Sequence, residues 1–336
     1  MATLRVGLCI DARFGEHVPP GDPDARAVGA PGHPEHPGRL AAIDSELDRR
    51  GLYGRTTALP ARPASRAELE RVHAPAYLDA LEVTLADRQR GWLDPDTYYA
   101  PGSHLAATLA AGAAIDCALA VLDGTVDSAF ALVRPPGHHA TRDRAMGFCL
   151  LNNVAAAAAA AKARGVRVAI FDWDVHHGNG TEAIFYEDGE VLYASMHEWP
   201  QYPGTGARTD VGRGAGVGAT VNVPVPSGTT GADYLALFRT AVRPALERFR
   251  PGLLLVSAGF DAHREDPLGG LALEDDTYRA LTDELLAIQP KLALVLEGGY
   301  HLPALARSAA LVVETLLAPA RADDRPGAPR PQAAHP

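Results

Sequence analysis

Short, largely apolar segments recur along the chain and alternate with stretches of helical pattern. These segments are runs of Val, Ile, Leu, Phe and Ala rather than an alternation of apolar and polar residues, which is typical of strands covered on both faces. They occupy residues 4–10, 129–133, 166–171, 191–196, 252–258 and 292–297. The pattern predicts an α/β fold, a doubly wound domain in which a mostly parallel sheet is flanked by helices.

The segments between these strands carry helix signals. Ser65 and Glu68 have the spacing of a capping box, and an alanine-rich run ends at Gly165, where glycine supplies a stop. Further helices are expected around residues 37–50, 103–124, 152–165, 232–249, 274–288 and 303–318.

No linker or internal repeat divides the chain. We therefore expect one domain over residues 1–320, followed by a disordered tail over 321–336 that is rich in Pro, Ala and charge. Residues 18–32 contain too many Pro and Gly for regular structure and are expected to form a long loop, whose role the sequence leaves open.

Composition excludes several classes of protein. The 336 residues carry a formal charge of -10 without a cluster of Lys and Arg, which argues against a nucleic-acid partner. No apolar run is long enough to span a bilayer, and the first residues lack the pattern of a secretory signal, so we expect a cytoplasmic protein without a membrane partner. The three cysteines have no CxxC spacing, so any metal is expected to be held by His and carboxylates.

Polar segments of similar composition follow four of the predicted strands. Their sequences are "RPPGHHA", "DWDVHHGNG", "GFDAH" and "GGY". In open parallel α/β sheets, ligands bind at the carboxyl ends of the strands, so these four segments are expected to meet in one pocket. Each segment alone has an ordinary explanation as a turn or a hydrogen-bonded pair, but their combination at four strand ends indicates a functional site.

The segment "DWDVHH" suggests a metal site. Asp174 and His176 stand at alternate positions of an extended segment and point the same way, with Asp172 one step behind them. Two such groups bind a divalent ion if another strand end supplies a third ligand; Asp261 is the natural candidate and His263 the alternate. A site of this kind, with a free coordination position, is catalytic rather than structural.

Two further segments offer groups for acid–base chemistry. His138 and His139 lie in a loop stiffened by Pro135 and Pro136, where one of them is placed to act as a general base toward a water molecule. Tyr300 follows two glycines and offers a phenol that can hydrogen-bond an oxyanion.

In this order and spacing, the motifs resemble the zinc-dependent histone deacetylase superfamily, which includes bacterial deacetylase-like amidohydrolases and acetylpolyamine amidohydrolases. The motifs are "HPEHPGRL", "RPPGHHA", "GFCLLNN", "DWDVHHGNGT", "YPGTG", "SAGFDAH" with "DPLGG", and "EGGY". The resemblance extends to about residue 318 and implies an arginase-like α/β domain with a largely parallel, eight-stranded sheet.

By this resemblance, Asp174, His176 and Asp261 match the zinc ligands, although such a ligand set also accepts ferrous iron. His139 matches the general base and acid. The other matched catalytic positions are His138 as its electrostatic partner, Asp172 linked to His138, Tyr300 as the transition-state tyrosine, and Asn179 where one branch of the family has Asp. The asparagine places the chain closer to the class II pattern.

Further positions match the surroundings of the family's site. The acyl channel would be lined by Gly147, Phe148, Tyr202 (commonly Phe in the family), Leu268 and Gly299. Arg39 matches an arginine of an inner cavity. A structural potassium site would involve Asp172, Asp174, His176, Ser195 and Met196. Asp96 is a candidate rim contact for a cationic substrate.

The resemblance implies metal-assisted amide hydrolysis, and four functions compete. The first is removal of acetyl or other short acyl groups from ε-acyl-lysine in peptides or proteins. Leu268 favours this function, because the polyamine-preferring branch of the family tends to have an acidic residue at that position after "DP". The second is hydrolysis of acetylpolyamines or small acylated amines. A non-catalytic acyl-lysine binding protein and a dimanganese ureohydrolase fit the motifs less well. A symmetric homodimer is a common default for soluble proteins.

Overall fold

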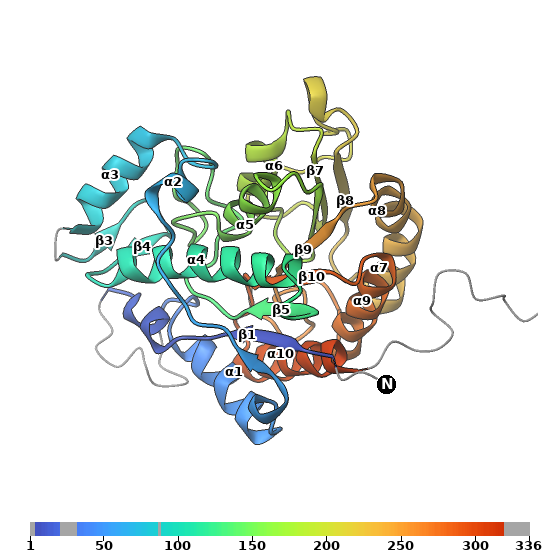
Figure 1. Ribbon diagram of the computed structural model, residues 1–336, viewed down its shortest axis with the longest axis horizontal. Helices are drawn as coiled ribbons and strands as arrows, with labels where there is room; N and C mark the ends of the chain where they lie inside the picture. The colour runs from blue at the N-terminus through green and yellow to red at the C-terminus, as the bar shows by residue number, and fades with distance from the viewer. Residues whose placement is uncertain (1–3, 21–31, 87–88, 319–336) are drawn as a thin grey trace, which may run out of the picture.

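Eight parallel strands form the central sheet of the computed structural model, which describes residues 4–20, 32–86 and 89–318 (Figure 1). The strands are β1 (Val6–Cys9), β2 (Thr57–Ala58), β5 (Ser128–Ala131), β6 (Val168–Asp172), β7 (Val191–Glu198), β8 (Thr220–Val225), β9 (Leu253–Ala258) and β10 (Leu292–Leu296). Their order across the sheet is β2-β1-β5-β10-β9-β6-β7-β8. The predicted fold class is therefore confirmed, and each of the six predicted strands is present.

Two strands of this sheet were not predicted, and both lie at its edges. In β8, Val221 and Pro224 are only partly buried and Asn222 is polar, so the strand lacks the continuous apolar run of the central strands. Proline is tolerated there because an edge strand has one unpaired side. β2 has two exposed residues, too few to leave a pattern.

Helices cover the sheet on both faces. α4 (Ser103–Leu122) and α5 (Asn153–Lys162) pack together on one face, and α1 (Gly38–Arg49), α9 (Asp275–Ile288) and α10 (Leu302–Leu317) form the opposite layer (Figure 1). The predicted helix over 232–249 consists of α7 (Gly231–Leu237), a π-helical turn, η4 (Phe238–Val242), and α8 (Arg243–Phe249).

Smaller elements complete the described chain. They are the 3-10 turns η1 (Ala12–Glu16), η2 (Tyr53–Arg55) and η3 (Gly214–Gly216), the helices α2 (Arg66–Leu69), α3 (Pro75–Ala86) and α6 (Asn179–Phe185), and an antiparallel pair, β3 (Gly91–Trp92) and β4 (Tyr98–Tyr99). The predicted capping box of Ser65 and Glu68 is present at the start of α2. The tail predicted over 321–336 and most of the 18–32 loop lie outside the described residues.

Helix α4 is long and apolar enough to cross a bilayer by length and composition alone. However, 72% of its apolar window is buried inside the molecule, where it packs against α5 and the sheet. A helix in a protein core is buried to this extent, so the length and composition of α4 are only weak evidence for a membrane span.

The carboxyl ends of the central strands meet at one edge of the sheet. Asp172, the last residue of β6, lies beside Ser195 of β7 and Ser257 of β9, and the last residues of β9 and β10, Ala258 and Leu296, are paired with each other. The polar segments that follow these strands are therefore brought together, as expected for a parallel sheet.

Candidate active site

Asp174, His176 and Asp261 converge at this edge of the sheet. One ligand atom from each lies within 4.8 Å of the other two. His176 Nδ1 is 3.1 Å from Asp174 Oδ1 and 3.3 Å from Asp261 Oδ2. Ligands on a tetrahedral ion with bonds of about 2.0–2.1 Å would be about 3.3 Å apart, so the cluster has the dimensions of a zinc-sized site.

The chemistry of the three side chains also fits a cation. Both carboxylates are fully buried, and Asp261 Oδ2 makes no hydrogen bond within the described part of the chain. Burial and the nearby Asp174 carboxylate raise the pKa of Asp261 to about 7. A divalent ion bound here would offset the repulsion between the Asp174 and Asp261 carboxylates, and Asp261 Oδ2 would coordinate it.

Backbone N–H groups orient the two carboxylates. Val175 donates to Asp261 Oδ1 (2.9 Å), and Gly298 donates to Asp174 Oδ2 (2.8 Å). A Cβ at Gly298 would lie 1.9 Å from Asp261 Oδ2, so only glycine lets the segment after β10 approach the Asp261 carboxylate this closely. The alternate ligand, His263, lies elsewhere: its Nε2 is 3.3 Å from Asp275 Oδ1.

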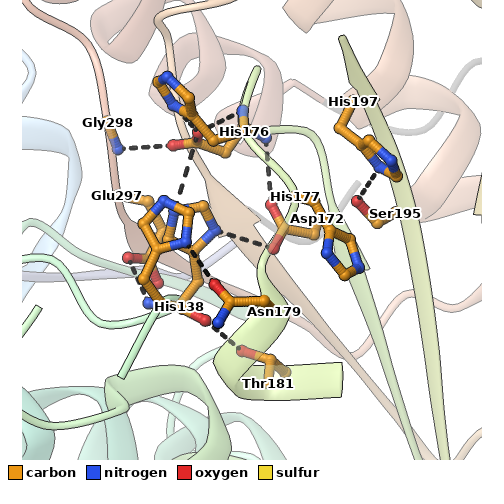
Figure 2. Close-up of polar contacts among 12 residues, drawn as sticks. His138, Asp172, His176, His177, Asn179, Thr181, Ser195, His197, Glu297 and Gly298 are labelled. Atoms are coloured by element: carbon orange, nitrogen blue, oxygen red, sulfur yellow. Dashed lines mark hydrogen bonds and ion pairs between the residues drawn. The ribbon is translucent and has the colours of Figure 1, made fainter. Parts of the chain in front are cut away.

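His138 is held by a buried acidic network (Figure 2). Its Nδ1 lies 3.1 Å from Asp172 Oδ2, which also accepts a hydrogen bond from the Tyr193 hydroxyl (3.1 Å). Burial lowers the pKa of His138, but the carboxylates of Asp174 and Asp172 outweigh it and raise this pKa to about 10. The geometry favours a cationic His138 imidazole when no metal is bound.

His139 has a neutral partner instead. Its Nδ1 lies 2.8 Å from Asn179 Oδ1, while the Asn179 amide donates to Met146 Sδ (3.4 Å), which fixes the amide with its oxygen toward the ring. Burial and the neighbouring His138 and His176 hold the pKa of His139 well below its usual range. With Nδ1–H donated to Asn179, Nε2 carries the free lone pair.

Tyr300 is partly buried and lies between an arginine and an aromatic ring. The Arg39 guanidinium sits 4.9 Å from the centroid of the Tyr300 ring, and the Phe148 ring meets it edge-on at 5.9 Å. Arg39 is fully buried and donates to the carbonyls of Gly299 (2.7 Å) and Glu297. Arg39 therefore binds the backbone that leads to Tyr300, and its Nη1 also lies 3.4 Å from Glu35 Oε1.

Three of the residues predicted to line an acyl channel lie beside His139 or Tyr300. The Tyr202 ring stands edge-on to His139 at 5.1 Å, and Phe148 adopts φ 69°, a left-handed conformation that is rare outside glycine. Gly147 contacts the His139 ring so closely that a Cβ would lie 2.4 Å from it. Leu268 is partly buried.

Asp96 lies farther out, in the turn between β3 and β4. Its carbonyl is 3.0 Å from His33 Nε2, and the His33 ring contacts Phe148 at 4.6 Å. Burial and the neighbouring Asp94 raise the pKa of Asp96. Asp96 Oδ1 accepts a hydrogen bond from the Thr97 hydroxyl (3.2 Å), which in turn accepts the Phe148 N–H (3.0 Å), so this carboxylate lies near an aromatic residue of the predicted channel.

Residues of the predicted potassium site are adjacent in the sheet. Ser195 lies beside Asp172, and its hydroxyl is 2.9 Å from His197 Nδ1, as Figure 2 shows. The Met196 carbonyl accepts a hydrogen bond from the Tyr234 hydroxyl (2.9 Å). The role of these residues in binding a cation stays a prediction.

Several buried polar residues of the site were not anticipated. Glu297 Oε2 accepts the backbone N–H groups of Gly137 (2.6 Å) and His138 (3.1 Å), and Oε1 has no partner within the described residues. Glu35 forms a buried ion pair with Arg134. In the sequence, the only sign that Glu297, Glu35 and Arg134 belong to the site is that they stand inside the quoted motifs, beside apolar strands or histidines.

Comparisons with known proteins identify the family. The family model "Histone deacetylase domain" matches residues 33–316. "Histone deacetylase 15" of Arabidopsis thaliana is 43% identical over 91% of this chain and 57% of its own length, so this chain spans little more than half of that relative. "Histone deacetylase-like amidohydrolase" of Pseudomonas aeruginosa is 44% identical over 81% of this chain and 73% of its own length.

Two further comparisons agree with these. "Polyamine deacetylase HDAC10" of Homo sapiens is 43% identical over 84% of this chain and 44% of its own length. The crystal structure of the HDA15 HD domain superposes with a TM-score of 0.87 at 41% identity, covering 94% of this chain and 90% of that one. The chain belongs to the histone deacetylase family.

Proposed function

We propose that this protein is a metal-dependent amidohydrolase that removes acetyl or other short acyl groups from acylated amines, chiefly ε-acyl-lysine in peptides or proteins. The observation that carries the proposal is the arrangement of His139. Its Nδ1 is engaged by Asn179 at 2.8 Å, and its ring lies 5.9 Å from that of the candidate ligand His176. A candidate general base therefore lies beside a candidate metal cluster.

Asp174, His176 and Asp261 would hold the metal, zinc or ferrous iron. When bound, such an ion polarises an acyl oxygen and lowers the pKa of water. His139 Nε2 would then accept a proton from the attacking water and return it to the leaving amine. The hydrogen bond from Nδ1–H to Asn179 keeps Nε2 as the acceptor.

His138 and Tyr300 would support this proton transfer. His138 is oriented by Asp172 and by the Glu297 carboxylate, which accepts its backbone N–H, so its ring is held next to the reacting groups. The Tyr300 hydroxyl would donate a hydrogen bond to the oxyanion that forms when water adds to the amide carbonyl.

Two substrate classes remain in competition. Leu268, predicted to line the channel, favours the aliphatic stem of an acyl-lysine, since a polyamine carries extra cationic groups that call for an acidic residue at that position. The Asp96 carboxylate, which Thr97 links to Phe148, favours a cationic acetylpolyamine, and one relative is named a polyamine deacetylase. A non-catalytic binding protein would not need the His139–Asn179 pair or Tyr300.

The test is acetate release by the purified protein from acetyl-lysine peptides and from acetylated polyamines, each with and without a zinc chelator. We expect release that the chelator abolishes and that added zinc restores. A higher kcat/KM for the peptide supports the first substrate class, and a higher value for the polyamine supports the second. No release from zinc-loaded protein with either substrate would contradict the proposed acetyl chemistry.

Replacing Tyr300 by phenylalanine should lower kcat about 10²- to 10³-fold, or about 2.7–4 kcal/mol, which is typical for the loss of one oxyanion donor. KM should change little, since the lost hydrogen bond forms mainly in the transition state. Steady-state kinetics on the better substrate measure both. Tyr53→Phe, which removes a surface hydroxyl bonded to Asp44, is the matched control. Full turnover by Tyr300→Phe would exclude this role.

Binding of potassium, assembly into a homodimer and location in the cytoplasm remain predictions from the sequence. Potassium would be supported if the melting temperature rose with added KCl but not with tetramethylammonium chloride at equal ionic strength.

A further inference from the structure

Asp266 makes several hydrogen bonds to the Tyr300 loop, residues 297–301, which joins β10 to α10. Its Oδ2 accepts the backbone N–H groups of both Tyr300 (2.6 Å) and His301 (3.0 Å). The residue is only 7% exposed, and hydrogen bonds from backbone N–H groups to a buried carboxylate are stronger than those between neutral groups. One carboxylate oxygen therefore holds the backbone on both sides of the Tyr300 carbonyl.

The second oxygen of Asp266 reaches a different part of the site. Oδ1 accepts the backbone N–H of Leu268 (3.0 Å), and the Asp266 N–H donates to the carbonyl of His263 (2.8 Å). The loop that begins with Asp261 is thereby joined to the loop that carries Tyr300. All of these partners are backbone groups of the two loops, so Asp266 contributes through the groups that it holds.

Tyr300 needs such an anchor because its loop is intrinsically flexible. Gly298 and Gly299 precede it, and Gly299 has φ +119°, a conformation that side chains rarely adopt. Arg39 holds the carbonyls of Glu297 and Gly299 from one side. Asp266 holds the two N–H groups that follow, so the backbone at Tyr300 is fixed both before and after the residue.

We propose that Asp266 is a positioning residue that fixes the Tyr300 hydroxyl for oxyanion stabilisation and couples this tyrosine to the channel residue Leu268. The inference rests on the proposed function, since it concerns the same reaction. A misplacement of about 1 Å in a catalytic group lowers the rate about 10²-fold, so a loose Tyr300 loop would reduce turnover without altering the chemistry.

The test is a double-mutant cycle between Asp266→Asn and Tyr300→Phe. The asparagine has the shape of aspartate but offers one acceptor oxygen to three N–H groups, so at least one of them loses its partner. We expect Asp266→Asn to lower kcat about 10- to 100-fold with little change in KM. In the Tyr300→Phe background the same substitution should lower kcat less than about 3-fold, because the hydroxyl that it positions is already absent.

Glu198→Gln is the matched control. Glu198 is also 7% exposed, and its Oε2 accepts a backbone N–H, that of Gly270 (2.6 Å), but within the described residues its side chain makes no hydrogen bond to residues 297–301. Any loss of turnover that Glu198→Gln causes should be the same in the wild-type and Tyr300→Phe backgrounds, so its own double-mutant cycle should be additive. Thermal melts of Asp266→Asn and Glu198→Gln report their loss of stability.

Two outcomes would overturn the inference. One is an equal loss of kcat from Asp266→Asn in both backgrounds, which would assign Asp266 a general structural role. The other is loss of bound zinc from Asp266→Asn, measured by metal analysis, which would place its effect at the metal cluster; we expect a full equivalent of zinc to be retained. Failure of the proposed function would appear separately, as an absence of acetate release from the zinc-loaded wild-type protein.

Discussion

Asp261→Asn should bind zinc more than about 100-fold more weakly than the wild-type protein and release no measurable acetate. Loss of a group that merely supports a ligand lowers metal affinity about 10- to 100-fold, so loss of a ligand should exceed this. The asparagine keeps an oxygen that can accept the Val175 N–H, so the strand end stays folded, but it removes the negative charge that the ion requires. Equilibrium dialysis against a zinc buffer and metal analysis measure the change.

His263→Asn is the matched control for this experiment. It lies two residues from Asp261 in the same segment, and the sequence offers it as the alternate ligand. In the structure it pairs with Asp275 at 3.3 Å, so its substitution should leave zinc affinity unchanged, whatever its effect on stability. Retention of zinc by Asp261→Asn together with its loss from His263→Asn would reverse the assignment.

The fold was predictable where burial is complete. Strands such as Leu253–Ala258 are fully buried, so their apolar runs are uninterrupted and stand out in the sequence. Strand Thr220–Val225 lies at the sheet edge, where partial exposure and Pro224 are tolerated, and it left no such run. Local sequence therefore reports the centre of a parallel sheet better than its edges.

The site was predictable for a different reason. Parallel strands place their carboxyl ends at one edge, so polar segments far apart in sequence could be assigned to one pocket without knowledge of their pairing. The choice between Asp261 and His263 depends on the path of a loop, which spacing does not determine. Contacts such as Asp266 to Tyr300 or Glu35 to Arg134 join residues 34 and 99 positions apart and follow from no local pattern.

Asn179 shows how one amide can set the behaviour of the general base. A carboxylate at this position would stabilise the imidazolium form of His139 by its charge, whereas the neutral amide orients the ring and raises the pKa of His139 only through its hydrogen bond. Burial already holds the pKa of His139 below its usual range. The base is therefore expected to remain neutral, and competent to accept a proton, down to a lower pH than it would with an aspartate partner.

His139→Gln should lower kcat about 10²- to 10⁴-fold, the usual contribution of general acid–base catalysis.

Asn179→Asp should keep the general base but shift the acidic limb of the pH profile of kcat/KM to higher pH. Activity falls as His139 becomes protonated, and the new carboxylate raises the pKa of His139, so protonation begins at a higher pH. Rate measurements between about pH 5 and 9 give both results. Either of two results would assign the general base to another group: an unchanged acidic limb in Asn179→Asp, or near-normal turnover in His139→Gln. His138, whose Nδ1 lies 3.1 Å from Asp172 Oδ2, would be the next candidate.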